Sequence, residues 1–242
     1  MAMQKELNQP KIHIEIRGLI KRYRYQPVLD GLDLTIEDGQ SCVLVGANGA
    51  GKTTLLRILA TFVRPDAGEI TINGMPINEA LHYRRKIGYV GHQAMFYQDL
   101  NALENLDHYA RLYQLKNIEV VVTESIRLVG LSKHAHKPLR TYSRGMQQRL
   151  SIARALLHEP SILLFDEPYT GLDQEAATFL DARLKELQQP GRLILIAAHR
   201  PQRLISIVSH VAWLKDGKIS HHIPVSQLPE APDLQSYLQE VA

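Results

Sequence analysis

Cysteine is almost missing from this 242-residue chain, which contains only Cys42. A single thiol excludes an internal disulfide, and the sequence has no paired cysteines or cysteine–histidine spacing that is typical of a zinc site. We therefore expect a protein of a reducing, cytoplasmic compartment.

Long apolar runs are also missing. The longest uninterrupted run covers residues 193–198, whereas a membrane-spanning helix needs about 20 apolar residues. Residues 1–10 are polar and lack the apolar stretch of a secretory signal. The sequence thus predicts a soluble protein with neither a membrane span nor a signal peptide.

A strong charge of either sign is missing as well. The 28 basic and 25 acidic residues give a net charge of +3 and are interspersed along the chain, so no nucleic-acid partner is expected. With 45% hydrophobic residues and no internal repeat, the composition is that of a globular protein. Its length allows one domain, or one domain carrying a subdomain.

Two strand patterns occur along the chain. Apolar residues 12, 14 and 16, and then 32, 34 and 36, alternate with polar ones, which predicts an antiparallel sheet near the N-terminus. Further on, apolar runs alternate with helical segments, which predicts a mostly parallel α/β core. The expected strands are residues 41–45, 69–72, 87–90, 162–165, 193–198 and a hairpin over 210–222; the expected helices are residues 53–60, 102–113, 120–129, 146–157, 174–188 and 233–241.

A phosphate-binding pattern follows the first apolar strand. The residues that match GxxxxGK[ST] are Gly46, Ala47, Asn48, Gly49, Ala50, Gly51, Lys52 and Thr53. Glycines let the backbone wrap a phosphate chain, and the next helix adds its positive end. We expect Lys52 at the β and γ phosphates, Thr53 on Mg²⁺ and Thr54 at the α-phosphate. The alternative is a glycine-rich turn that binds nothing, which the strand–loop–helix context disfavours.

Two carboxylates end a second apolar strand. Asp166 is expected beside Mg²⁺, and Glu167 is suited to activate the attacking water as a general base. An acidic strand end that merely faces solvent is the weaker alternative once the phosphate-binding pattern is present. The two motifs together predict a nucleotide hydrolase that uses Mg²⁺.

Three further motifs make the chain resemble the ATP-binding-cassette (ABC) transporter ATPases. They are Tyr-Ser-Arg-Gly-Met-Gln-Gln-Arg-Leu at 142–150, Pro-Tyr-Thr-Gly-Leu-Asp at 168–173 and Ala-His at 198–199, in the family's order and spacing. The resemblance implies an α/β P-loop fold with a RecA-like, mostly parallel core. To this core it adds an N-terminal antiparallel β subdomain and a helical signature subdomain near 94–158. It implies a single cassette domain over 10–222 and a tail or helix over 223–242.

The same resemblance implies roles for individual residues. Tyr23 matches the aromatic that stacks on adenine, with Tyr25 as an open second candidate. Gln93 matches the glutamine that senses Mg²⁺ and water and faces the membrane partner, and His199 matches the histidine that contacts the γ-phosphate. Residues expected to act across a dimer interface are Ser143, Gly145 and Asp173.

The signature departs from the family's commonest form, LSGGQ. Tyr142, Arg144 and Met146 replace its Leu, its first Gly and its Gln. Ser143 and Gly145, which approach phosphate in the family, remain, so the helix start is still expected to bind an anion. Arg144 is expected either to add charge or to point to solvent.

One phosphate loop and one signature per chain imply partners. In this family the loop and the signature serve opposite nucleotides, so two identical chains are expected to close head to tail on ATP and to separate after hydrolysis. Without a membrane span of its own, the chain is expected to join integral membrane subunits at the cytoplasmic face of the membrane.

A finer resemblance concerns the cargo. The segments at 91–93, 97–106, 143–150 and 167–173 are similar to the ATPase of the haem exporter used in c-type cytochrome biogenesis. The alternatives are an ABC-2-type exporter of a drug, lipid or polysaccharide, and a module that binds ATP only to dimerise.

Two histidine pairs suggest a haem or metal site at first sight. These pairs, His134 with His136 and His221 with His222, lack the third and fourth ligands that a site needs. We therefore expect surface histidines and no direct haem contact.

Overall fold

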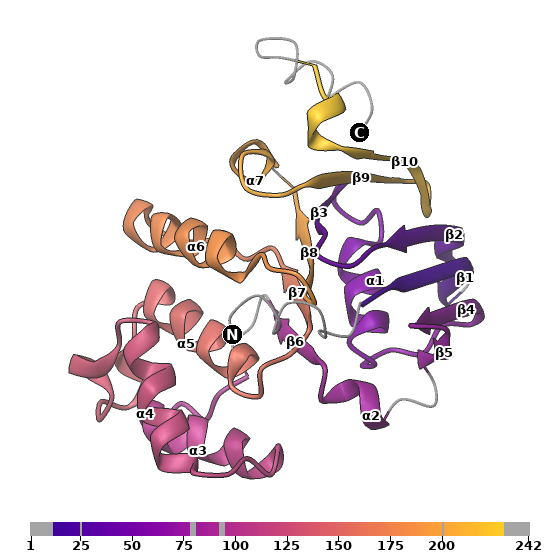
Figure 1. Cartoon of the computed structure of the whole chain (residues 1–242). Helices are drawn as coiled ribbons and strands as arrows, with labels where there is room; N and C mark the ends of the chain where they lie inside the picture. Colours follow the sequence, from indigo (N-terminus) through magenta and orange to yellow (C-terminus); the bar gives the residue numbers. More distant parts are fainter. Residues whose placement is uncertain (1–11, 25, 78–80, 92–94, 200, 230–242) are drawn as a thin grey trace, which may run out of the picture.

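The structure is a computed structural model that describes residues 12–24, 26–77, 81–91, 95–199 and 201–229. A six-stranded, mostly parallel sheet forms its centre (Figure 1). Its strands are β3 (Ser41–Val45), β6 (Ile87–Val90), β7 (Ile162–Asp166), β8 (Leu193–Ala198), β9 (His210–Lys215) and β10 (Lys218–Pro224). They lie in the order β10-β9-β3-β8-β7-β6, and only β10 runs antiparallel to its neighbour. Every residue of β3, β7 and β8 is buried, because helices and a second sheet cover both faces.

That second sheet is antiparallel and has four strands in the order β2-β1-β4-β5. Its strands are β1 (Ile14–Tyr23), β2 (Gln26–Ile36), β4 (Ala67–Ile72) and β5 (Met75–Pro76). The register places Ile14 opposite Ile36 and Ile16 opposite Leu34, so the alternating apolar residues of both strands share one face. Helix α1 (Lys52–Leu59) lies between the two sheets and contacts β2, β7 and β8 (Figure 1).

A helical lobe extends from the other side of the central sheet (Figure 1). It contains α3 (Ala102–Leu112), α4 (Ile118–Leu128) and α5 (Arg144–Leu156), which bury an apolar cluster of their own. Asn101 and Glu104 start α3 with reciprocal side-chain-to-backbone hydrogen bonds, a capping box. Helix α5 also packs on β6 and on α6 (Gln174–Leu187), so it joins the lobe to the sheet.

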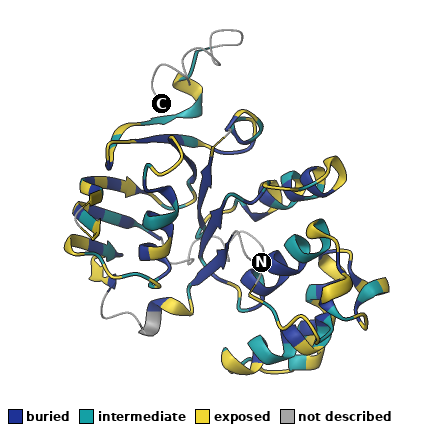
Figure 2. Cartoon of the chain, turned by 180° about the vertical axis from the view of Figure 1, so that it is seen from behind, coloured by how far each residue is buried: buried dark blue, intermediate teal, exposed yellow. Residues whose placement is uncertain are grey.

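The layers explain the burial pattern. Buried residues concentrate in the central strands and on the inner sides of the helices, while exposed residues mark the outer sides (Figure 2). One apolar cluster fills the space between the two sheets and another lies under α6. Cys42 lies inside the first cluster, and burial raises the pKa of its thiol to about 12.

The parallel strands bring the predicted motifs to one edge of the sheet. Val45 pairs with Ala198, and Asp166 pairs with Ala197, so β3, β7 and β8 end side by side. The segments that follow them are the loop at 46–51, the carboxylate pair and His199. Open α/β sheets bind ligands at this edge.

The predicted fold is confirmed: a mostly parallel core, an antiparallel sheet from the N-terminal half, and a helical region that lies in sequence between β6 and β7 of the core. Several short elements had not been predicted. They are α2 (Leu81–Arg84), α7 (Gln202–Ile205), β5 and the 3-10 helices η3 (Ser132–His134), η4 (Leu139–Thr141) and η5 (Val225–Gln227). The helix expected near 233–241 lies outside the described residues. In the described part of the chain, no helix has the length and apolar character needed to cross a bilayer.

Candidate functional site

The loop at 46–51 joins β3 to α1 and is shaped by close backbone approaches. A Cβ atom on Gly46 would collide with the carbonyl oxygen of Leu214, and one on Gly51 would lie 2.8 Å from that of Val28. Gly51 also has a φ of 109°, a left-handed conformation that side chains disfavour. Glycine is therefore required at both positions, and the loop is held against β9 and β2.

Lys52 lies under this loop. Its side chain is buried, and Nζ donates hydrogen bonds to the carbonyl oxygens of Gly46 at 2.7 Å and Ala47 at 3.0 Å. Burial lowers the pKa of Lys52, while the carboxylates of Glu167 and Asp166 act in the opposite direction. The ammonium group therefore lies close to the curve of the loop, where it can meet a phosphate chain.

Asp166 connects the loop to the central sheet. It is 2% exposed, and its two carboxylate oxygens accept hydrogen bonds from Thr53 Oγ1 at 2.8 Å and from Tyr89 Oη at 3.1 Å. A hydroxyl and a carboxylate oxygen in contact are the donors that Mg²⁺ prefers. The pair therefore fits the predicted metal site.

Glu167 follows directly, at the turn that leaves the sheet. It is half-buried and has a φ of 51°, and its N–H donates to Ala197 O at 3.0 Å. This bond places Glu167 next to the end of β8, which His199 follows as an exposed residue. The structure thus gathers Lys52, Thr53, Asp166, Glu167 and His199 on the same sheet edge.

Ser143 and Gly145 lie at a different place, where α5 meets α6. Ser143 Oγ accepts a hydrogen bond from Met146 N at 3.2 Å and so caps α5. A Cβ on Gly145 would lie 3.0 Å from that of Ala176. Both residues line a hollow of about 300 Å³ whose other walls are Gly130, Leu131, His134, Met146, Arg149, Asp173, Glu175 and Ala176. No residue of the phosphate loop lines it.

Asp173 and Arg144 make hydrogen bonds close to Ser143 and Gly145. Asp173 caps α6 by accepting a hydrogen bond from Ala176 N at 2.8 Å. Arg144, which was expected to add charge or to point to solvent, is exposed, and its Nε donates to Thr170 O at 2.8 Å. Its guanidinium is therefore engaged with the segment that follows Glu167.

The remaining predicted site residues are Tyr23, Tyr25 and Gln93. Tyr23 ends β1, is 45% exposed and has Lys21 Nζ at 5.6 Å from its ring centre. Tyr25 and Gln93 lie outside the described residues. Among the described residues no group of three or more potential metal ligands is present.

The histidines at 221 and 222 do not act as a pair. Neighbouring residues of a strand point to opposite faces, and His222 instead lies beside His210 of β9, with ring centres 5.4 Å apart. His221 packs edge-on against Trp213.

Two features of the site had not been predicted from the sequence. One is the hydrogen bond from Tyr89 to Asp166, since a tyrosine inside an apolar strand gives no sign of its polar partner. The other is the Arg144 contact with Thr170, which joins residues 26 positions apart. Only the replacement of a glycine by arginine in the signature marked that position as unusual.

Comparison with known families gives one match over most of the chain. The profile of the family described as "ABC transporter" matches residues 29–170. The chain is 31% identical over 204 residues to the ABC transporter ATP-binding protein NatA of Bacillus subtilis, covering 83% of each chain. It is 32% identical over 222 residues to the spermidine/putrescine import ATP-binding protein PotA of Nitratidesulfovibrio vulgaris, covering 90% of this chain and 60% of that protein.

Solved structures give the same match. One is the ATP-binding cassette MJ0796 in a dimeric post-hydrolysis state bound to ADP and Pi, with a TM-score of 0.79, 26% identity and coverage of 88% of this chain and 98% of that chain. Another is an ATP-binding subunit of an ABC transporter, with a TM-score of 0.83, 26% identity and coverage of 93% of this chain and 99% of that chain.

Proposed function

Because this chain belongs to the ABC transporter family of ATP-binding proteins, we propose that it hydrolyses ATP with Mg²⁺ to drive a membrane transporter. The observation that carries the proposal is the joint placement of Lys52, Thr53, Asp166 and Glu167 at one sheet edge. A module that bound ATP only to dimerise would need the loop but would gain nothing from Glu167 and His199.

Binding is the task of the loop and the first turn of α1. The loop N–H groups and the positive end of α1 attract the phosphate chain, Lys52 supplies a positive charge to the β and γ phosphates, and Thr54 lies one residue further for the α-phosphate. Thr53 and Asp166 would hold Mg²⁺, which when bound neutralises charge on the phosphate oxygens. Tyr23 is the proposed adenine contact.

Hydrolysis is the task of the residues after β7 and β8. Glu167 is half-buried beside the metal-binding pair, so its carboxylate can accept a proton from the attacking water. His199 is exposed at the neighbouring strand end, where it can donate a hydrogen bond to the γ-phosphate. Gln93 is proposed to orient the water and Mg²⁺.

A second copy of the chain is proposed to complete each ATP site. Ser143 and Gly145 line an open hollow that the phosphate loop does not reach, so they are free to meet a nucleotide held by another chain. Asp173 belongs to the same hollow. The dimeric cassette that this fold resembles supports the arrangement.

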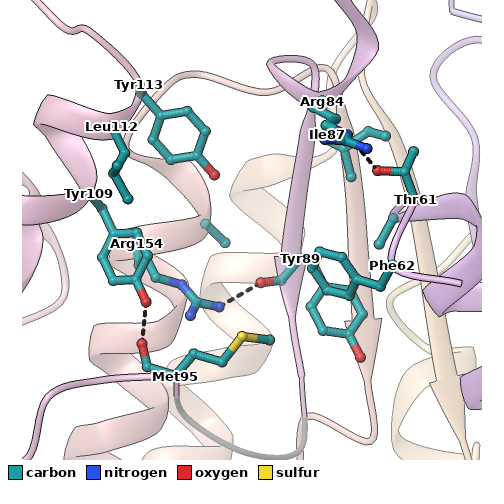
Figure 3. A pocket seen from close by; sticks show the side chains of 12 residues that line it. Thr61, Phe62, Arg84, Ile87, Tyr89, Met95, Tyr109, Leu112, Tyr113 and Arg154 are labelled. Carbon is teal, nitrogen blue, oxygen red and sulfur yellow. Dashed lines mark hydrogen bonds between the residues drawn. The ribbon is translucent and has the colours of Figure 1, made fainter. Parts of the chain in front are cut away.

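The proposed membrane partner has a place to dock beside the Gln93 segment. Tyr89 and Met95, which flank that segment, line a groove of about 600 Å³ between the central sheet and the helical lobe (Figure 3). Phe62, Met95 and Leu112 are between 47% and 64% exposed there, an apolar surface that suits a helix from a membrane subunit. The cytoplasmic face of the membrane is the proposed location.

The hydrolase proposal is tested with Glu167→Gln. We expect kcat to fall by about 10² or more, because the general base is lost, while ATP binding persists and size-exclusion chromatography detects an ATP-bound dimer. Glu119→Gln, which alters an exposed glutamate of α4, is the matched control. Unchanged phosphate release by Glu167→Gln would contradict the assignment.

Haem export is the proposed cargo function, based on the segments at 91–93, 97–106, 143–150 and 167–173. Export of another substrate by an ABC-2-type transporter is the second candidate. The match to NatA, an ABC transporter ATP-binding protein covered to 83%, supports the cassette and does not favour haem over another cargo. PotA supports the cassette, but its spermidine/putrescine import is a property of that protein.

The cargo is tested by deleting the gene in its host and measuring covalently bound haem on c-type cytochromes. Loss of holocytochrome, restored by the wild-type gene and not by Glu167→Gln, is the expected result. Normal holocytochrome would contradict haem export and leave the ATPase proposal intact.

A further inference from the structure

Arg144 joins two segments that carry different parts of the proposed machinery. It is the first residue of α5, directly after Ser143, and its Nε donates to Thr170 O at 2.8 Å. Thr170 belongs to the segment at 167–173, which begins with Glu167 and ends with Asp173. The hydrogen bond therefore links the signature to the segment that carries the proposed general base.

Gly171 makes this contact possible. Its φ is +74°, and a Cβ atom there would lie 2.5 Å from Arg144 Nε and 2.7 Å from Cδ. The arginine side chain thus lies against the backbone of Gly171, in space that any other residue would fill. Hydrogen bond and packing together restrain the guanidinium although the residue is exposed.

The segment at 167–173 has its own turn hydrogen bonds, from Thr170 N to Glu167 O and from Leu172 N to Tyr169 O, both at 3.2 Å, and Tyr169 and Leu172 pack on the apolar cluster under α6. At its start, Glu167 N donates to Ala197 O; at its end, Asp173 caps α6. Between them, Tyr169 Oη donates to Asp181 Oδ1 at 2.7 Å, which holds a side chain rather than the backbone of the exposed Thr170. Arg144 supplies the hydrogen bond from α5 to this stretch.

We propose that Arg144 is a positioning residue that holds the Glu167 segment of its own chain against its own signature helix. The proposal rests on the proposed ATPase function. Since Glu167 serves the ATP of its own chain and Ser143 that of the other chain, the Arg144 contact makes the two sites move together. Arg144 itself touches neither nucleotide.

The test separates positioning from nucleotide contact. Arg144→Ala in the full-length chain is expected to lower kcat about fivefold or more, because a small displacement of the base slows the chemistry, with KM for ATP within about twofold. When combined with Glu167→Gln, it should still give the ATP-bound dimer. Arg127→Ala, which removes an exposed arginine of α4 paired with Glu124, is the matched control and should keep the wild-type kcat.

Three results would overturn the inference. They are an unchanged kcat in Arg144→Ala, loss of the ATP-bound dimer in the double variant, and full rescue of kcat by Arg144→Lys. Dimer loss would indicate that Arg144 acts on the opposite nucleotide, and lysine rescue would indicate that its charge alone matters.

A double-mutant cycle adds a test that needs no rescue. Gly171→Ala should lower kcat, and adding Arg144→Ala should cause no further loss, because both changes break one contact. Additive losses would also overturn the inference. If the wild-type chain releases no phosphate and Glu167→Gln forms no dimer, the proposed function itself has failed, which is a different outcome.

Discussion

The phosphate loop and the signature both start a helix, but they differ in how the N–H groups at the helix start are hydrogen-bonded. Gly51 starts α1 in a left-handed conformation, and in the described structure no side chain caps this end. Ser143 starts α5 with its own hydroxyl as the cap. The first helix start thus leaves its N–H groups to a ligand, whereas the second is already partly satisfied within the chain.

Their surroundings differ in the same direction. Lys52 and Asp166 beside the first helix start are buried, whereas Ser143 and Arg144 are exposed. Buried charges interact strongly with a bound ligand, whereas an exposed and capped helix start is accessible to the surface of another chain. This difference fits the proposed ATP site shared by two chains.

Replacing Lys52 in the phosphate loop should have the largest effect, a loss of ATP affinity. Lys52→Met is expected to raise the Kd for ATP about 100-fold, because truncating one partner of a close charge pair costs about 2–5 kcal/mol. The free energy of unfolding should stay within about 1 kcal/mol of wild type, since two lost hydrogen bonds are offset by removal of a buried charge.

Isothermal titration calorimetry and urea unfolding measure these two quantities. Lys133→Met, which changes an exposed lysine of η3, is the control and should alter neither. Retained ATP affinity in Lys52→Met would contradict the phosphate-loop assignment.

A pair of alanine substitutions compares the glycines of the two regions. Gly51→Ala should lower the free energy of unfolding by about 2 kcal/mol or more, through its positive φ and its contact with Val28 O. Gly145→Ala should change it by less than about 1 kcal/mol, because helix propensity offsets the close Ala176 contact. Urea unfolding measures the free energy of unfolding of both variants. Equal losses in Gly51→Ala and Gly145→Ala would show that the phosphate loop is not the more constrained region.

Removing the cap of α5 tests the second region. Ser143→Ala is expected to cost about 1 kcal/mol of stability, and Ser143→Asp should restore the cap. Alanine would lack the hydroxyl that contacts phosphate, and aspartate would repel phosphate. Neither variant should therefore form the ATP-bound dimer when combined with Glu167→Gln. Dimer formation by Ser143→Asp would argue against a phosphate contact at this position.

The far end of the signature helix provides the smallest expected effect, which depends on pH. His158 follows α5, stacks on Tyr113 with ring centres 3.9 Å apart, and its Nε2 donates to Ile87 O at 3.1 Å. Nδ1 is buried with no hydrogen-bond partner among the described residues, and burial lowers the pKa of His158.

Because the pKa of His158 is lowered in the folded state, the unfolded state takes up its proton at a higher pH than the folded state does as the pH falls. The stabilising contribution of neutral His158 is therefore complete above about pH 6.5 and is lost as the pH falls through the folded-state pKa. We expect the urea midpoint of wild type to fall further than that of His158→Gln between pH 8 and pH 5.5. His136→Gln, at an exposed histidine, should follow wild type; parallel curves for all three would refute the prediction.

Much of this fold is predictable because the spacing of apolar residues indicates its strands. The alternation at residues 12–16 and 32–36 fixes which face is buried, and the observed register pairs Ile14 with Ile36. The four-residue helices α2 and α7 are too short to show a helical period. The register shift between Ile16 and Leu19 was not predicted from that alternation either.

The site divides in a similar way. The loop at 46–53 and the Asp166–Glu167 pair are local patterns, so the sequence predicts them together with their position at strand ends. The contacts of Asp166 with Tyr89 and of Arg144 with Thr170 join distant segments, and no local pattern encodes them. The proximity of His222 and His210 likewise appears only once β9 and β10 are paired.

The burial of Cys42 has a practical consequence. A thiol with a pKa near 12 inside the core does not react with maleimide dyes at neutral pH. Cysteines introduced at exposed Glu69 of β4 and Glu119 of α4 would therefore be labelled selectively without removal of the native one. Energy transfer between two such dyes would record the distance between the antiparallel sheet and the helical lobe through a turnover cycle.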